Sequence, residues 1–218
     1  MKPYYEHGGV TLYHGDCGAV MDALAPSWGD RPFDLLLTDP PYGIGTWSAS
    51  GGNSLTASEC AEINKWDTRD VVPLVNAAVR MCRYAVVWGG NYFDLGRTRH
   101  PLVWDKGIRG MHFADGEMAW TNFNFGTLRI LQFPIASGDT KGKRLHPTQK
   151  PEAVIAWCLA IAGARVSSVF DPFAGSGTTL VEAKRMGKTC VGIEREERYC
   201  EIAAKRLAQE ALPLEFTA

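Results

Sequence analysis

Residues 166–179 read VSSVFDPFAGSGTT, a short apolar run that leads into a glycine-rich turn. An apolar run of this length is typical of a buried strand, and the glycines allow a tight turn into the helical stretch that ends near Gly187. Ser176 and Thr178 could cap that helix. Glycines let the backbone approach a ligand closely, and N–H groups at the start of a helix can meet an anionic group. The stretch therefore predicts a nucleotide-type pocket in an α/β fold.

The glycine pattern differs from two common phosphate-binding motifs. It lacks the third glycine of the dinucleotide fingerprint, and it lacks the Lys-Ser or Lys-Thr pair of a P-loop. A second strand is expected over residues 189–193, and it ends in Glu194, 23 residues after Asp171. An acidic residue about 20 residues on can accept hydrogen bonds from ribose hydroxyls. Asp171 and Glu194 are therefore candidate ligands of a nucleoside-type cofactor.

A second motif lies far upstream, where the apolar run FDLLLT of residues 33–38 ends in Asp39, Pro40, Pro41 and Tyr42. The amino nitrogen of adenine or cytosine is a weak nucleophile because its lone pair is delocalised into the ring. The Asp39 carboxylate and the Pro40 carbonyl could accept both N–H bonds of such an amine, and Tyr42 could stack on the base. Taken alone, the tetrapeptide is also ordinary turn chemistry.

Together these motifs resemble those of S-adenosylmethionine-dependent DNA amino-methyltransferases of the permuted β class. In that family Asp-Pro-Pro-Tyr precedes Asp-Pro-Phe-x-Gly-Ser-Gly-Thr, as it does here. A third family signature, HPTQKP at residues 146–151, lies directly before the cofactor segment. The resemblance runs from roughly Val10 to Leu207. It implies direct transfer of a methyl group from S-adenosylmethionine to an exocyclic amine, without a covalent enzyme intermediate.

The resemblance also assigns roles to individual residues. The catalytic residues that it implies are Asp39, Pro40, Pro41 and Tyr42. Asp16 and Cys17 are expected to border the adenine ring of the cofactor, and Glu194 is expected to hold the ribose. The methionine end is assigned to His146, Thr148, Lys150, Asp171, Pro172, Phe173, Ala174, Gly175, Ser176, Gly177 and Thr178. For His146, a loop histidine without a ligand is the alternative, and no metal ligand is expected.

Strands that alternate with helices predict a three-layer α/β sandwich in a single domain, residues 1–218. The resemblance implies a mostly parallel, seven-stranded, Rossmann-like methyltransferase sheet with one antiparallel edge strand and a circularly permuted motif order. Ligands of open α/β sheets bind beyond the carboxyl ends of the strands, so the acidic residues at four predicted strand ends should converge. These are Asp16, Asp39, Asp171 and Glu194. Further helices are expected over residues 19–24, 71–82, 151–162 and 196–210, and further strands over 85–88, 102–104, 117–120 and 128–133.

The composition is that of an ordinary globular chain, with 45% hydrophobic and 22% charged residues among 218. That length is enough for one well-buried core. The six cysteines form no Cys-x-x-Cys pair and no close group with histidine, so we expect reduced thiols rather than a zinc site or disulfides. No run approaches about 18 apolar residues and the start of the chain does not read as a signal peptide, so we expect a cytoplasmic protein with no membrane partner.

The formal net charge is −1, but basic residues are concentrated in the middle of the chain, because residues 97–150 carry nine lysines and arginines against four acidic residues. The basic residues include Arg97, Arg99, Lys106, Arg109, Lys141, Lys143 and Arg144, interleaved with Trp104, Phe113, Trp120, Phe123 and Phe125. This mixture suits a surface that follows phosphates, so we expect double-stranded DNA as partner and a small target-recognition insertion within residues 97–145. The alternative is solvated charges beside core aromatics. Many relatives are dimers, so the resemblance also suggests a homodimer.

The form of the catalytic motif bears on the target base. In the family, Asp-Pro-Pro-Tyr goes mostly with adenine N6, and a serine in the first position with cytosine N4. We therefore expect a site-specific N6-adenine methyltransferase, with N4-cytosine as the alternative. The intact motifs disfavour an inactive DNA- or cofactor-binding module, and their order disfavours enzymes that act on RNA adenine or protein glutamine. The segment 43–58, rich in glycine and serine, is expected to be a loop that closes over DNA.

Overall fold

The computed structural model describes residues 1–45, 56–110, 114–134 and 149–209. Across these residues the strands form one nine-stranded sheet in the order β1-β2-β9-β8-β3-β4-β6-β5-β7. Five neighbouring strands at its centre, from β2 to β4 in that order, run parallel. The strands are β1 (Tyr5–His7), β2 (Val10–His14), β3 (Phe33–Thr38), β4 (Cys82–Trp88), β5 (Leu102–Asp105), β6 (Gly116–Thr121), β7 (Arg129–Gln132), β8 (Ser168–Asp171) and β9 (Thr189–Glu194).

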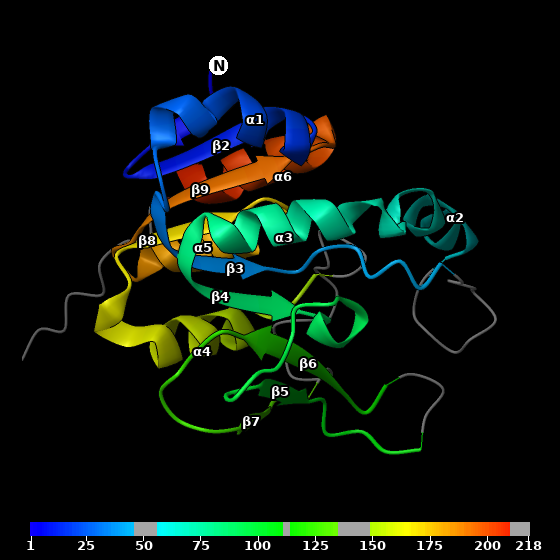
Figure 1. Ribbon diagram of the computed structural model, residues 1–218. Coiled ribbons are helices and arrows are strands. Elements are labelled where there is room, and N and C mark those ends of the chain that lie inside the picture. Colours follow the sequence, from blue (N-terminus) through cyan, green and yellow to red (C-terminus); the bar gives the residue numbers. More distant parts are fainter. Residues whose placement is uncertain (46–55, 111–113, 135–148, 210–218) are drawn as a thin grey trace, which may run out of the picture.

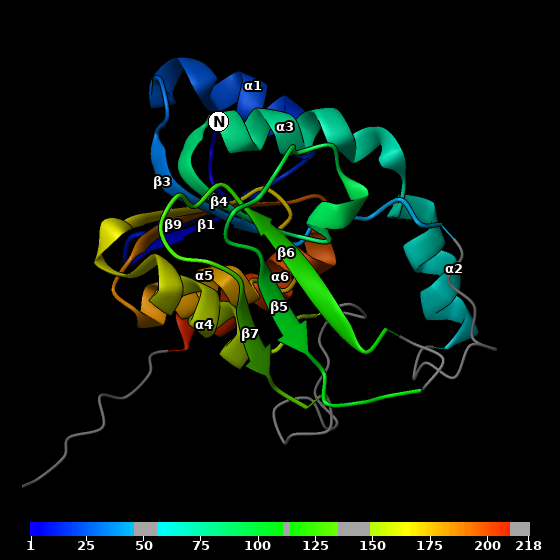
Figure 2. The same cartoon turned by 60° about the horizontal axis from the view of Figure 1, so that its bottom comes forward.

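Helices cover both faces of the sheet, which makes the molecule a three-layer sandwich (Figures 1 and 2). One face carries α1 (Cys17–Trp28) and α3 (Val72–Arg80), and the other carries α4 (Glu152–Ala162), α5 (Thr178–Arg185) and α6 (Glu197–Ala208). The remaining helix, α2 (Ala57–Trp66), lies at the end of the sheet toward which β3 and β4 point (Figure 1).

The two-sided core follows from the alternation of side chains along the central strands. Leu35 and Leu37 pack with α4, α5 and α6, whereas Leu36 packs with α1 and α3, and all three are fully buried. A continuous apolar run is expected of a parallel strand that is covered on both faces. Burial of each leucine contributes about 1.5 to 3 kcal/mol, so β3 anchors both helical layers.

The predicted fold class is confirmed, but two details of the sheet were wrong. Among the described residues the sheet has nine strands rather than seven, with β1 at one edge and β7, the strand expected over residues 128–133, at the other. The reversed strand expected at an edge is β6, which lies between β4 and β5. The reason is that β5 and β6 form an antiparallel hairpin and β6 is the member that pairs with β4. A second reversed strand, β1, does lie at an edge.

One predicted boundary was also wrong. The helix expected over residues 71–82 ends at Arg80, and β4 begins at Cys82 instead of Ala85. Cys82 and Tyr84 pair with Phe33 and Leu35 of β3. Only Met81 separates the end of the helix from the start of the strand, and apolar residues occur on both sides of it, so hydrophobic periodicity could not place the boundary.

Candidate active site

Four neighbouring parallel strands bring the predicted acidic residues to one edge of the sheet. The strands β2, β9, β8 and β3 are adjacent in the sheet, and their carboxyl ends carry or precede Asp16, Glu194, Asp171 and Asp39, respectively. The Gly15 N–H donates to the Glu194 carbonyl over 2.9 Å, which holds the first two strand ends together. The four acidic residues therefore lie at one edge of the sheet, as expected from their places at the strand ends.

Both carboxylate oxygens of Asp39 accept hydrogen bonds from side chains. The Tyr42 hydroxyl donates to Oδ1 over 2.7 Å, and the Lys150 ammonium donates to Oδ2 over 2.7 Å. The Lys150 side chain is only 6% exposed, whereas that of Asp39 is 24% exposed. The carboxylate thus keeps a solvent-facing side while its two oxygens are held in a fixed orientation.

A second carboxylate, Glu117, completes this cluster. Its Oε2 lies 2.8 Å from Lys150 Nζ, and its Oε1 lies 2.7 Å from Lys106 Nζ. The Tyr42 hydroxyl also reaches Glu117 Oε2 at 3.3 Å. Two carboxylates and two ammonium groups therefore compensate each other at the edge of the sheet. Sequence reasoning missed Glu117, because it was seen only as part of a short strand.

The charges in this cluster fix which groups donate hydrogen bonds. Burial alone would lower the pKa of Lys150, but the Asp39 and Glu117 carboxylates outweigh it and raise that pKa. Burial and both carboxylates raise the pKa of Tyr42 well above its usual range. Lys150 is thus an ammonium and Tyr42 a phenol, and both donate to Asp39.

The two carboxylates differ in their number of cationic partners. Burial acts to raise the pKa of Glu117, but Lys150 and Lys106 together lower it to about 2. Burial raises the pKa of Asp39, and its single ammonium partner, Lys150, does not offset this. The charge of Asp39 therefore depends on the single ammonium of Lys150, whereas that of Glu117 is supported by two ammonium groups.

The chain around Tyr42 is held by three features of its surroundings. A Cβ built on Gly89 would lie 2.2 Å from Tyr42 Cε1, so the ring packs directly over this glycine at the end of β4. The buried Asp67 carboxylate accepts the N–H groups of Gly43 and Gly45 at 2.6 and 3.1 Å. The Tyr92 ring stacks on Tyr42 with centroids 5.2 Å apart. These contacts fix the turn after the motif and aim the aromatic ring.

Asp171 holds the glycine-rich turn together from inside. It is 3% exposed, and its Oδ1 accepts hydrogen bonds from Thr38 Oγ1 at 2.7 Å and Phe173 N–H at 3.1 Å. Burial raises the pKa of Asp171 to about 6, although these hydrogen bonds oppose it. Its expected contact with the cofactor stays a prediction. The Ala174 N–H donates to the Ile193 carbonyl over 2.9 Å and ties the turn to β9.

The start of α5 does not have the cap that the sequence predicts. Gly177 is the N-cap residue, with φ +80°, and no side chain among the described residues caps the helix. The hydroxyls of Ser176 and Thr178 instead accept hydrogen bonds from Arg206. The first N–H groups of α5 therefore have no side-chain cap among the described residues, and they form the positive end of the helix dipole.

At the other end of the predicted cofactor segment, Glu194 accepts two backbone N–H groups. Its Oε2 accepts from Gly175 at 2.8 Å and its Oε1 from Glu196 at 2.7 Å. Each oxygen retains a lone pair for a ribose hydroxyl. Asp16 caps α1 by accepting from Ala19 at 3.0 Å. Burial raises the pKa of Cys17 to about 11, so this residue is a neutral thiol beside that helix start.

The remaining predicted residues fall into two groups. His146 and Thr148 lie outside the described residues, as do Phe113, the three basic residues at 141, 143 and 144, and most of the 43–58 segment. Lys150 lies against Asp39, and its expected role at the methionine end of the cofactor stays a prediction.

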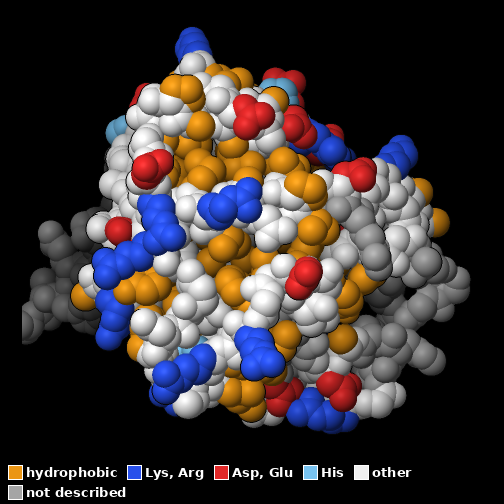
Figure 3. All heavy atoms as spheres, viewed as in Figure 1, with side chains coloured by type: hydrophobic (Ala, Val, Ile, Leu, Met, Phe, Trp, Pro, Cys, Tyr) orange, Lys and Arg blue, Asp and Glu red, His pale blue; other side chains and the backbone are white. Residues whose placement is uncertain are grey.

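Much of the basic middle segment belongs to the sheet. Trp104, Trp120 and Phe123 are buried in the core, which was the alternative interpretation of this segment. Lys106 is paired internally with Glu117, and the exposed Arg109 is paired with Asp105 at 2.8 Å. On the face drawn in Figure 3, lysines and arginines lie mainly to the left and below, with hydrophobic side chains between them. A DNA-binding role for this segment stays a prediction.

Comparison with known proteins identifies related chains. The model of the DNA methylase family matches residues 84–205, more than half of the chain. The type II methyltransferase M.ScaI of Streptomyces caespitosus is 26% identical over 98% of this chain and 86% of its own. The type II methyltransferase M2.LlaDCHI of Lactococcus lactis subsp. cremoris is 24% identical over 96% of this chain and 93% of its own.

Two solved structures share the fold. The PvuII DNA methyltransferase, described as cytosine-N4-specific, superposes with a TM-score of 0.65 at 14% identity and covers 97% of this chain and 90% of its own. The M1.HpyAVI complex with S-adenosylmethionine superposes with a TM-score of 0.58 at 18% identity, over 92% of this chain and all of its own.

The chain therefore belongs to the N6/N4 DNA methylase family, the S-adenosylmethionine-dependent DNA amino-methyltransferases. Its cofactor is S-adenosylmethionine, and the uncapped start of α5 and the Glu194 carboxylate suit the carboxylate and hydroxyl groups of that molecule. Within the described residues, no helix has the length and apolar character needed to cross a membrane.

Proposed function

We propose that the chain methylates the exocyclic N6 amine of an adenine that is flipped out of double-stranded DNA. The observation that carries this proposal is the position of the Asp39 carboxylate. It follows β3, next to β8, whose end leads into the glycine-rich turn. Amine acceptor and cofactor turn therefore lie at neighbouring strand ends, as a direct transfer between them requires.

In this proposal the catalytic residues act by orienting the target amine. Asp39 and the Pro40 carbonyl accept the two N–H bonds of the amine and turn its lone pair toward the methyl group. Pro41 fixes the Pro40 carbonyl, and Tyr42 stacks on the base. A base inside the duplex cannot reach this edge, so it must be extruded at a cost of a few kcal/mol.

We assign the cofactor to the carboxyl ends of β8, β9 and β2, which lie on the side of β3 away from β4. When bound, S-adenosylmethionine supplies an electrophilic methyl group on a sulfonium. The N–H groups at the start of α5 would hold its carboxylate and Glu194 its ribose, while Asp16 and Cys17 would border its adenine. The aromatic face of Phe173 or Tyr42 would favour the sulfonium charge.

The choice of adenine rests on the Asp-Pro-Pro-Tyr form of the motif, and N4-cytosine is the alternative. The two relatives named as type II methyltransferases support methylation at specific sites within restriction and modification. Residues 97–145 are the proposed target-recognition segment of a single domain. Their described part supplies β5, β6 and β7.

The test is incubation with S-adenosylmethionine and duplex DNA of mixed sequence, followed by mass spectrometry of the nucleosides. We expect N6-methyladenine. N4-methylcytosine would overturn the choice of base, and cofactor binding without any methylated nucleoside would support an inactive binding module. The variant Asp39→Ala should lose methyl transfer and keep cofactor binding in calorimetry, and near wild-type activity in it would contradict the assignment of the catalytic motif.

A further inference from the structure

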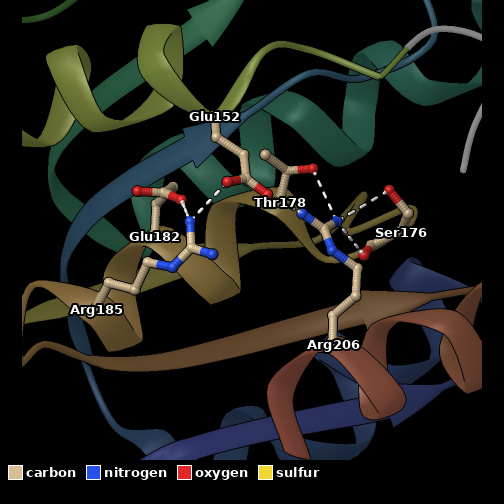
Figure 4. Close-up of polar contacts among 6 residues, drawn as sticks. All are labelled: Glu152, Ser176, Thr178, Glu182, Arg185 and Arg206. Carbon is tan, nitrogen blue, oxygen red and sulfur yellow. Dashed lines mark hydrogen bonds and ion pairs between the residues drawn. The ribbon is translucent and has the colours of Figure 1, made fainter. Parts of the chain in front are cut away.

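A partly buried arginine on α6, Arg206, contacts the glycine-rich turn (Figure 4). Arg206 Nη1 donates to the Ser176 carbonyl at 2.7 Å, to Ser176 Oγ at 3.3 Å and to Thr178 Oγ1 at 3.1 Å. The Arg206 side chain is 12% exposed. One guanidinium therefore contacts two residues of the turn, and one of these contacts fixes the backbone itself.

The turn needs such support because of its backbone conformation. Gly175 and Gly177 have φ of +52° and +80°, and glycine loses more conformational freedom on folding than any other residue. A Cβ built on Gly177 would lie 2.8 Å from Ala203 Cβ, so α6 packs directly against the turn. Ala203 and Arg206 are three residues apart and lie on the same side of α6.

The same guanidinium also reaches the segment that carries Lys150. Arg206 Nη2 donates to Glu152 Oε1 at 2.7 Å, and Glu152 opens α4 only two residues after Lys150. Pro151 lies between them and restricts the backbone. Lys150 in turn donates to Asp39. A short, stiff path therefore joins the glycine-rich turn to the catalytic carboxylate.

A neighbouring arginine provides an internal comparison. Arg185 Nη1 binds the other oxygen of Glu152 at 2.6 Å and also binds Glu182 (Figure 4). Its side chain is 49% exposed, and these two contacts are to acidic side chains of α4 and α5. Arg185 thus shares Glu152 with Arg206 but makes neither of the contacts to Ser176 and Thr178 described above.

We propose that Arg206 is a positioning residue that holds the glycine-rich turn in its cofactor-binding conformation and couples this turn, through Glu152 and Lys150, to Asp39. This inference rests on the proposed assignment of the turn to S-adenosylmethionine. Charge-assisted hydrogen bonds to a backbone carbonyl and two hydroxyls are among the stronger polar contacts, so their loss should loosen the turn before it unfolds the chain. Loss of the bond to Glu152 should affect methyl transfer more than cofactor binding.

The first experiment compares Arg206→Met, Arg206→Lys and Arg185→Met without DNA. We expect Arg206→Met to weaken S-adenosylmethionine binding in calorimetry by about tenfold or more, and Arg206→Lys to give a smaller loss. Arg185→Met should stay within about twofold of the wild type. In the absence of cofactor, amide hydrogens of residues 173–177 should exchange faster in Arg206→Met than in Arg185→Met.

The second experiment separates the two roles of Arg206. Glu152→Gln keeps the contacts to Ser176 and Thr178, so we expect nearly unchanged S-adenosylmethionine affinity and a kcat several times lower at saturating cofactor. Folded Arg206→Lys or Arg206→Met protein with wild-type affinity and wild-type exchange would overturn the inference, and an unchanged kcat in Glu152→Gln would overturn the coupling. Failure of the wild-type protein to bind S-adenosylmethionine would instead contradict the proposal that the glycine-rich turn binds this cofactor.

Discussion

The ammonium of Lys150 lies 2.7 Å from Oδ2 of Asp39, so a side chain of this protein occupies one acceptor position of the carboxylate proposed to receive the target amine. Tyr42 occupies the other oxygen. Glu117 Oε2 lies within 2.8 Å of Lys150 and 3.3 Å of the Tyr42 hydroxyl, so both donors have a second acceptor within reach. Asp39 can therefore turn toward a substrate amine without leaving either donor unpaired.

This arrangement makes Lys150→Met a test of how Asp39 keeps its charge. Without the ammonium, burial and Glu117 both favour the neutral acid, so the pKa of Asp39 should rise further. A protonated carboxyl group is a poorer acceptor, so the acid limb of the kcat/KM profile should move to higher pH. The measurement is methyl transfer to DNA as a function of pH.

The matched control for Lys150→Met is Lys106→Met. Lys106 pairs with Glu117 at 2.7 Å, and its substitution by methionine removes the same charge as Lys150→Met does. Its acid limb should stay close to that of the wild type. Identical profiles for Lys150→Met and the wild type would show that the ammonium does not govern Asp39.

Gly89→Ala tests the packing beneath the catalytic tyrosine. The new Cβ would lie 2.2 Å from Tyr42 Cε1, so the ring must move, and φ of +64° adds backbone strain of about 1 kcal/mol. We expect kcat to fall by about a hundredfold, because a displacement of roughly 1 Å can have that effect. Steady-state kinetics and thermal unfolding together measure the two effects.

Gly96→Ala separates the strain from the displacement. Its φ is +76°, but nothing lies within 4 Å of the added Cβ. It should therefore lose a similar free energy of unfolding, about 1 kcal/mol, with kcat unchanged. An equal loss of kcat in both variants would show that strain, and not the position of Tyr42, explains the effect.

The carboxylates of Asp171 and Asp34 should contribute to the free energy of unfolding with opposite dependences on pH. The folded-state pKa of Asp171 is about 6, above the unfolded value of about 3.9, so the folded state binds more protons between these values. Its contribution to stability therefore falls as pH rises from about 4 to 6, by on the order of 2 to 3 kcal/mol. In Asp171→Asn, the free energy of unfolding measured by urea denaturation should not show this decrease between about pH 4 and 6.

Asp34 serves as the comparison at the opposite end of the sheet. Burial acts to raise its pKa, but the N–H and hydroxyl groups of Ser167 and Ser168 lower it below the usual range. Its stabilisation is present above the unfolded pKa and is lost as pH falls through the folded one. Asp34→Asn should therefore be most destabilising at neutral pH. Parallel pH profiles for both variants would contradict these assignments.

The sequence predicted the parts of the site that depend on local pattern. Local sequence patterns indicated the apolar strand before Asp39 and the strand, turn and helix around residues 166–179. A strand that is buried on both faces is a continuous apolar run, and a tight turn contains glycine. The position of acidic groups at strand ends followed from these signals and from the rule that parallel strands share a carboxyl edge.

The parts that it could not predict depend on contacts between distant elements. Glu117 reaches the neighbours of Asp39 only because β6 is antiparallel to β4 and therefore begins at the carboxyl edge of the parallel strands. That direction depends on the hairpin of β5 and β6 and on its pairing with β4, which no local sequence pattern indicates. Arg206 has the helical spacing of the buried Tyr199 and Ala203, but the sequence does not show what an arginine at that position would bind. Its role appears only when α6 packs behind the glycine-rich turn.

Two substitutions of Tyr42 separate the two functions proposed for it, the hydrogen bond to Asp39 and the stacking on the base. Tyr42→Phe keeps the ring over Gly89 and against Tyr92 but removes the hydroxyl that donates to Asp39, so kcat should fall by about tenfold. Tyr42→Ala also removes the stacking surface, which contributes about 1 to 3 kcal/mol per base, and should lose at least a further tenfold. Fluorescence of 2-aminopurine at the target position should report base extrusion in Tyr42→Phe and little in Tyr42→Ala. Equal losses of kcat and fluorescence in the two variants would assign the role to the hydroxyl and exclude stacking.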